Sequence, residues 1–241
     1  MYSYDKNEVF KYIYQALQAK LVHVQYTTAK ALKLQGSMLD LAQNNKKSVD
    51  GLTNVIHRLY KYRKRLEKRI QQAGASNNTN EKKMLSLVNA LSAEVEDIQL
   101  STIISSKVIK FSADSLLMTI LKAQHYQWRE LVYMSALSQN NNIPQHDEFS
   151  CALGKWYHGE GKDKFSHLPA FSKLGDYHSK FHRISAEISK EGFDGGCWEK
   201  IYRNLEEFEK YSNLVISALD ELDEHIIMLE KINFDSAHSI R

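Results

Sequence analysis

The sequence predicts an all-α fold, and three features of its composition and patterning support this. Only two prolines and ten glycines occur among 241 residues, so few positions would interrupt a helix. Apolar residues recur every three or four positions over most of the chain, which is the period of an amphipathic helix. An apolar content of 43% beside 25% charged residues is typical of a folded protein. The length allows one large helical domain or two smaller ones.

The first helical stretch is expected from about residue 5 to residue 41. Its apolar positions include Val9, Phe10, Ile13, Leu17, Leu21, Val24, Leu32 and Leu39. The polar run at residues 43–47 predicts a turn, after which Ser48 or Asp50 can cap a second helix. Apolar residues at helical spacing continue in that second helix as far as Ile70.

Residues 73–80 read Ala-Gly-Ala-Ser-Asn-Asn-Thr-Asn, which is the composition of a linker. Helical patterning resumes near Glu81 and continues without a break through His125 to Val132. Helices joined by such a linker predict a hairpin or coiled-coil-like segment. We assign residues 1–110 to this N-terminal helical segment, whose role the sequence does not identify.

The second half of the chain has shorter elements. An asparagine-rich loop is expected at residues 139–144, and a short element is expected around Cys151. Glycines and lysines at residues 158–164 predict another loop. Two amphipathic helices follow, at about residues 170–190 and 198–232, and the second of them is strongly acidic.

The net charge of +3 is small, but the charges are unevenly distributed. Residues 57–69 read HRLYKYRKRLEKR and hold seven lysines and arginines against one glutamate. Such a segment could contact an anionic partner, either a membrane surface or a nucleic acid, or it could be a solvated helix face.

The segment that follows Met1 is polar and shows no signal-peptide pattern, and no run of about 18 apolar residues predicts a transmembrane span. The two cysteines, Cys151 and Cys197, are too few for a disulfide framework. These features predict a cytoplasmic protein.

Four potential metal ligands are the main chemical feature of the sequence: His125, Cys151, His178 and His182. The four-residue spacing of His178 and His182 places both imidazoles on one face of a helix. Four nitrogen and sulfur donors are the number and type that a tetrahedral zinc ion binds. Taken one at a time, each residue has a plainer interpretation, as a surface or core histidine or as a buried cysteine. A catalytic role for Cys151 lacks an orienting third residue and an oxyanion hole in the sequence.

Taken together, these motifs resemble the chemoreceptor zinc-binding domain, a module of bacterial chemoreceptors and diguanylate cyclases. The similarity extends over about residues 112–228. It is carried by His125-Tyr126-Gln127-Trp128, Val132-Tyr133, Cys151-Ala152-Leu153-Gly154-Lys155-Trp156-Tyr157, Leu168-Pro169-Ala170-Phe171 and His178-Ser179-Lys180-Phe181-His182.

The resemblance implies that residues 111–230 form a C-terminal four-helix-bundle zinc-binding domain, followed by a tail at residues 231–241. It also implies that His125, Cys151, His178 and His182 bind Zn²⁺ and that the protein forms a homodimer. The diguanylate cyclase signature Gly-Gly-(Asp/Glu)-Glu-Phe does not occur in the sequence. No tip motif of a chemoreceptor hairpin is recognisable in residues 1–110.

These features predict a zinc-binding sensory or regulatory protein of bacterial signalling, of which chemotaxis is one form. Zinc occupancy or oxidation of Cys151 would alter helix packing and signal through the N-terminal helices to a protein partner. Four protein ligands leave no open position for a substrate, so an enzymatic role is not expected. The alternative is a helical interaction or scaffold protein in which the zinc is purely structural.

Overall fold

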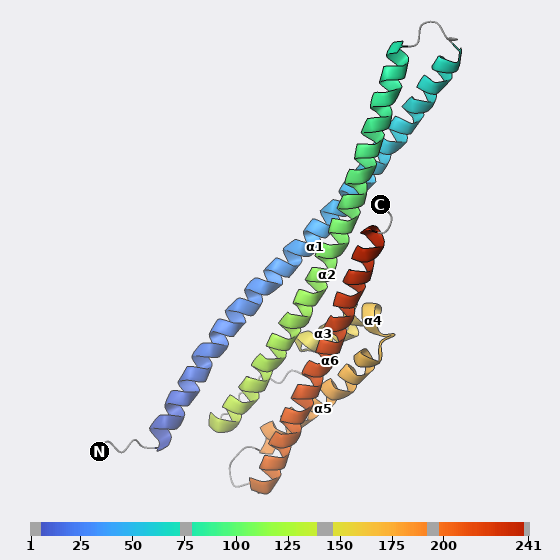
Figure 1. Cartoon of the computed structure of the whole chain (residues 1–241). Helices are drawn as coiled ribbons and strands as arrows, with labels where there is room; N and C mark the ends of the chain where they lie inside the picture. Colours follow the sequence, from blue (N-terminus) through green and yellow to red (C-terminus); the bar gives the residue numbers. More distant parts are fainter. Residues whose placement is uncertain (1–5, 73–78, 139–146, 192–197, 239–241) are drawn as a thin grey trace. The chain divides into compact units, whose positions relative to one another are not determined.

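The computed structural model describes residues 6–72, 79–138, 147–191 and 198–238 (Figure 1). Every regular element in these ranges is helical, which confirms the predicted all-α class. The six helices are α1 (Lys6–Gln72), α2 (Thr79–Ser138), α3 (Ala152–His158), α4 (Glu160–Phe165), α5 (Pro169–Glu191) and α6 (Trp198–His238). The asparagine-rich loop predicted at residues 139–144 lies outside the described residues.

The chain divides into two compact units. One contains residues 1–35 and 114–229, and the other contains residues 36–113 and 230–241. The helices α1, α2 and α6 each contribute residues to both units. The separate behaviour of residues 1–110, 111–230 and 231–241 as domains stays a prediction.

The unit formed around residues 36–113 contains an antiparallel helical hairpin. Its contacts run in opposite directions along the two helices: Tyr62 Oη lies 3.2 Å from Met84 Sδ, Gln99 Nε2 donates to Thr53 Oγ1 at 2.7 Å, and Ser106 Oγ donates to the Ala42 carbonyl at 2.9 Å. The buried apolar side chains of residues 36–113 are Ala42, Leu66, Val88, Val95 and Ala113. The hairpin predicted from the linker is therefore present, with α2 beginning at Thr79.

The prediction of a turn at residues 43–47 is wrong, because α1 passes through this region as one helix. The run is polar but contains neither proline nor glycine, and polar side chains at solvent-facing positions cost a helix little. Ala42 on one side of the run is buried, and Val49 on the other side is half-buried, with its carbonyl 3.4 Å from Gln99 Nε2. Packing against α2 on both sides of the run therefore keeps the helix continuous.

The other unit brings together residues 6–35 of α1, residues 114–138 of α2, helices α3, α4 and α5, and residues 198–229 of α6. Helices α2 and α6 are antiparallel, as shown by Ser115 Oγ donating to Asp223 at 2.6 Å and Arg129 pairing with Glu209 at 3.0 Å. Helix α1 joins α2 through Gln127 Nε2, which donates to Thr28 Oγ1 at 2.9 Å. A hydrophobic cluster fills the space between α2, α5 and α6, and its buried members are Val132, Phe181, Ile184, Ile188 and Phe208.

The prediction of a loop at residues 158–164 is also wrong, because Glu160–Phe165 forms the short helix α4. Gly161 lies against the Trp156 ring, and a Cβ at this position would come within 2.9 Å of two ring carbons. The glycine therefore permits close packing of α4 on α3 instead of marking a loop. Trp156 in turn packs near Phe165 and Phe171, so this aromatic group joins α3 and α4 to the start of α5.

Candidate metal centre

Cys151 is positioned by a tight turn and by the start of α3. The Asp147 carboxylate accepts backbone N–H groups from Phe149 at 3.1 Å and Ser150 at 2.7 Å, which fixes the turn. Cys151 is then the N-cap of α3, and its Sγ accepts the Gly154 N–H at 3.2 Å. A Cβ on Gly154 would lie 1.9 Å from the Glu148 carbonyl oxygen. Glycine is therefore required for the turn to approach α3 this closely.

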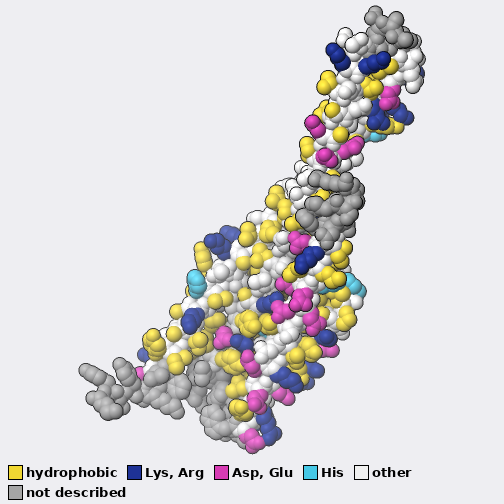
Figure 2. Space-filling model, in the orientation of Figure 1, with side chains coloured by type: hydrophobic (Ala, Val, Ile, Leu, Met, Phe, Trp, Pro, Cys, Tyr) yellow, Lys and Arg dark blue, Asp and Glu magenta, His cyan; other side chains and the backbone are white. Residues whose placement is uncertain are grey.

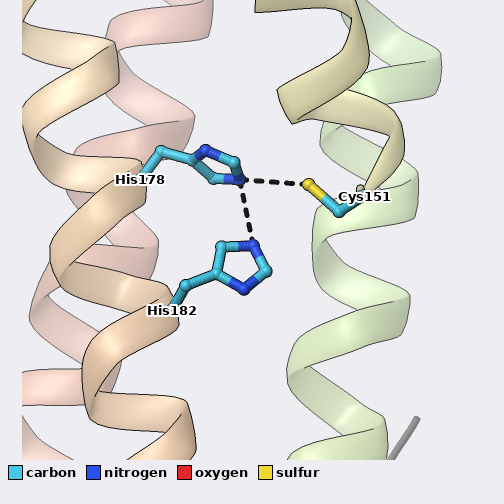
Figure 3. A group of neighbouring side chains, drawn as sticks. All are labelled: Cys151, His178 and His182. Atoms are coloured by element: carbon cyan, nitrogen blue, oxygen red, sulfur yellow. Dashed lines mark hydrogen bonds between the residues drawn. The ribbon is translucent and has the colours of Figure 1, made fainter. Parts of the chain in front are cut away.

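His178 and His182 lie one turn apart on α5, and both side chains are buried. Figure 3 shows the two imidazoles on the same side of α5, facing the thiol of Cys151. His178 Nε2 lies 3.3 Å from Cys151 Sγ and 3.1 Å from His182 Nε2. One ligand atom from each of the three residues lies within 4.8 Å of the others.

His125 projects from α2 beside the same group and is 5% exposed. Its Nε2 lies 3.1 Å from the hydroxyl of Ser212 on α6, and its ring packs on Phe181 with centroids 4.3 Å apart. It lines, together with Cys151, His178 and His182, a cavity of about 30 Å³. The structure thus groups three of the four predicted ligands and places His125 at the wall of their cavity. The complete four-ligand set stays a prediction.

The three grouped side chains fit a zinc ion. Zinc bonds of about 2.3 Å to sulfur and about 2.0 Å to nitrogen, at tetrahedral angles, separate ligand atoms by roughly 3.3–3.6 Å. The separations of 3.3 Å between Cys151 Sγ and His178 Nε2 and of 3.1 Å between His178 Nε2 and His182 Nε2 are close to these values. The third pair, Cys151 and His182, has its ligand atoms within 4.8 Å. One thiol and two imidazoles are also a donor set that zinc accepts.

Burial keeps His125 and His178 neutral near pH 7. Burial lowers the pKa of His125 and the pKa of His178, and electrostatic repulsion from the neighbouring His182 acts in the same direction, so that both pKa values fall to about 3. Neutral imidazoles have the free lone pair that a metal ligand needs. Burial also raises the pKa of the Cys151 thiol, while the Gly154 and Leu153 N–H groups act in the opposite direction. Metal binding would therefore have to displace the thiol proton.

His182 also borders a second, more open pocket, of about 660 Å³. The ring of Trp128 lies 5.9 Å from the ring of His182 between centroids, and both residues line this pocket and the smaller cavity. Asp147, Glu148 and Phe149 form part of the remaining wall. The open pocket therefore approaches the metal centre from the His182 side.

The partners that hold the ligands in place are not predicted by the sequence analysis. Ser212 is one of three serines in the acidic helix α6, and nothing in its local sequence indicates contact with a residue 87 positions earlier. The N-cap role of Cys151 has no sequence signal either, because cysteine is not among the residues preferred at a helix N-cap.

The fold is helical, and its Cys151, His178 and His182 form a donor group that could hold a metal ion. Residues 125–189 match the model of a protein family described as the chemoreceptor zinc-binding domain. This match confirms the resemblance for that part of the chain, which includes His125, Cys151, His178 and His182. Searches of curated proteins and of solved structures found no match. None of the helices in the described ranges has an apolar stretch long enough to cross a lipid bilayer.

Proposed function

We propose that the protein is a zinc-responsive regulatory protein of bacterial signalling. The observation that carries this proposal is the meeting of Cys151, His178 and His182 at one cavity, with His125 in its wall. These residues come from α2, the start of α3, and α5. A zinc ion bound there would tie three helical elements together.

Zinc binding would act mainly on helix packing. The four ligands can bind one metal ion only when the helices are packed together. Zinc binding would therefore stabilise the packing of α2 and α3 on α5. Loss of zinc, or oxidation of the Cys151 sulfur, would remove this contribution. Cys151 is only partly buried, so an oxidant could reach it. Two packing arrangements that differ in metal content are what a sensor requires.

Helix α2 is the proposed route of the signal. It extends without interruption from Thr79 to Ser138, so His125 lies on the same helix as one arm of the hairpin. A shift or rotation at His125 would therefore be carried along a continuous backbone. We further propose that the protein acts as a cytoplasmic homodimer and that the hairpin contacts a signalling partner.

The centre is proposed to be regulatory and not catalytic. If all four predicted residues bind the metal, its tetrahedral shell is complete and no position remains for a water molecule or substrate. With a shell of this kind, zinc would bring structural stability and a reactive thiolate but would not activate water.

Metal analysis of purified protein by mass spectrometry tests the proposal. We expect about one zinc ion per chain, and little zinc in Cys151→Ala or His178→Ala variants. His167→Ala is the matched control, because His167 is exposed and outside the donor group. Absence of zinc after reconstitution, or equal zinc in all variants, would refute the proposed centre.

The alternative is a helical scaffold with a purely structural zinc. The two functions differ in how readily the metal exchanges. A dissociation constant of about micromolar or weaker, with a folded metal-free form, supports the sensor. Binding too tight to exchange, with global unfolding on chelation, supports the scaffold.

A further inference from the structure

The closed end of the helical hairpin carries a strong excess of positive charge. We define the hairpin end as residues 54–72 of α1 and 79–93 of α2, which hold nine lysines and arginines against two glutamates. Both glutamates lie near an arginine: Glu67 pairs with Arg63 at 3.5 Å, and Glu81 pairs with Arg69 at 3.4 Å. The excess is therefore seven positive charges among the described residues of this end. The intervening residues 73–78 contain no charged side chain in the sequence.

An exposed apolar strip lies along the same end. The contact of 3.2 Å between Tyr62 Oη and Met84 Sδ places these two side chains on one side of the hairpin. Leu87 and Leu91 follow Met84 by three and seven residues, so they continue the strip along α2. The exposed fractions are 42% for Tyr62, 45% for Met84, 70% for Leu87 and 47% for Leu91. Large apolar side chains left open to this extent in a row indicate a contact surface.

Cations border this apolar strip on both helices. Arg58 precedes Tyr62 by four residues and Arg65 follows it by three, so both lie next to Tyr62 on α1. Lys83 precedes Leu87 by four residues and lies next to it on α2. All three cations are exposed. Figure 2 shows lysine and arginine side chains beside hydrophobic ones at this end of the hairpin.

We propose that the hairpin end binds the surface of a bilayer that contains anionic lipids. The apolar strip would enter the boundary between headgroups and acyl chains, while Arg58, Arg65 and Lys83 would meet lipid phosphates. A nucleic acid would satisfy the cations but would offer little to the strip around Leu87. A second copy of the chain would cover the strip but would bring two groups of seven excess positive charges together. The combination of cations with exposed apolar side chains therefore favours lipid.

Vesicle sedimentation with the full chain tests this proposal, which does not depend on zinc. We expect binding to phosphatidylcholine vesicles with about 30% phosphatidylserine at about 0.1 M salt, and much weaker binding to pure phosphatidylcholine. The variant Arg58→Glu, Arg65→Glu should bind at least about tenfold more weakly. The control Lys46→Glu, Lys47→Glu changes the net charge equally at exposed positions of α1 outside the hairpin end, and it should keep most of the binding.

A Leu87→Gln variant tests the apolar strip without changing the charge. We expect a loss of about three- to tenfold in vesicle binding, because an inserted leucine contributes hydrophobic free energy that glutamine does not. Circular dichroism of each variant checks that helix content is retained.

Three results would overturn the proposal. Equal loss in the hairpin-end variant and in the lysine control would mean that net charge alone drives vesicle binding. Binding to duplex DNA or RNA but not to vesicles would assign the surface to nucleic acid. Self-association that Leu87→Gln abolishes, without vesicle binding, would assign the strip to a second copy of the chain.

Discussion

At the residue scale, His125, Cys151 and His178 lie in surroundings that oppose charge on them. Burial lowers the pKa of His125 and His178 to about 3, well below the ordinary histidine value near 6.5. Burial raises the pKa of the Cys151 thiol above its ordinary value. Near neutral pH these two histidines are therefore ready to bind a metal, whereas the cysteine must first lose a proton.

Release of the Cys151 proton should make the apparent zinc affinity depend on pH. His125 and His178 are already neutral above about pH 5, so their titration adds nothing there. Thiolate formation at Cys151 requires proton release below the thiol pKa, so affinity rises as pH rises. We expect the dissociation constant to fall at least about tenfold per pH unit between about pH 6 and about pH 8. Competition titrations with a chelator of known affinity measure this slope, and an affinity that does not change with pH would contradict release of the Cys151 proton.

Gly154 should be indispensable for the metal centre. A Gly154→Ala methyl group would lie 1.9 Å from the Glu148 carbonyl oxygen, so the turn that presents Cys151 must shift. We expect a loss of about 2–3 kcal/mol in the free energy of unfolding and weaker zinc binding. Chemical denaturation and zinc titration measure both effects.

Gly51→Ala is the matched control for Gly154→Ala. Gly51 lies in α1, and a methyl group added there would meet no atom within 4 Å, so alanine should stabilise by about 0.5–1 kcal/mol. Similar effects of the two substitutions would show that close approach at Gly154 is unimportant.

The sequence motif predicts the ligand types and the shared face of His178 and His182, because a spacing of four residues fixes neighbours on a helix. It does not predict that His125 Nε2 contacts Ser212. That contact depends on how α6 packs on α2, and such long-range packing cannot be predicted from the local sequence.

At the element scale, α1 is one helix of 67 residues where the sequence analysis predicts two. Polar composition at residues 43–47 suggests a turn only if the helix has no neighbour to support it. Ala42 and Val49 contact α2 on either side of the run, and this support cannot be read from the run itself. The loop predicted at residues 158–164 fails for the same reason. Gly161 lies in α4 because it packs closely on Trp156, and this contact cannot be read from the local composition.

A proline substitution distinguishes the continuous helix from a turn. Asn44→Pro would remove a backbone N–H and clash with the preceding helical turn, which costs about 3 kcal/mol or more inside a helix. We expect lower helix content and faster proteolysis near residue 44, and no such change in Asn44→Ala. Tolerance of proline at this position would indicate that α1 is broken there.

At the scale of the whole molecule, signalling requires that metal binding change the structure of parts of α2 outside the metal centre. Helix α2 contributes His125 to one compact unit and residues 79–113 to the other. If zinc shifts α2, backbone hydrogen bonds in both parts of the helix should respond.

Hydrogen exchange of zinc-loaded and zinc-depleted protein tests this transmission. We expect zinc to slow exchange around Cys151, along residues 175–185 and around His125, with a smaller effect within residues 79–113. Cys151→Ala serves as the control and should lose all of these differences. Protection confined to the ligands would contradict signalling through α2 while leaving the metal centre intact.

The most direct test of the central claim is zinc-edge X-ray absorption spectroscopy of the zinc-loaded protein. We expect one sulfur at about 2.3 Å and three imidazole nitrogens at about 2.0 Å, with one nitrogen lost in His125→Ala. A spectrum without sulfur, or one that His125→Ala and His178→Ala both leave unchanged, would show that these residues do not form the zinc centre.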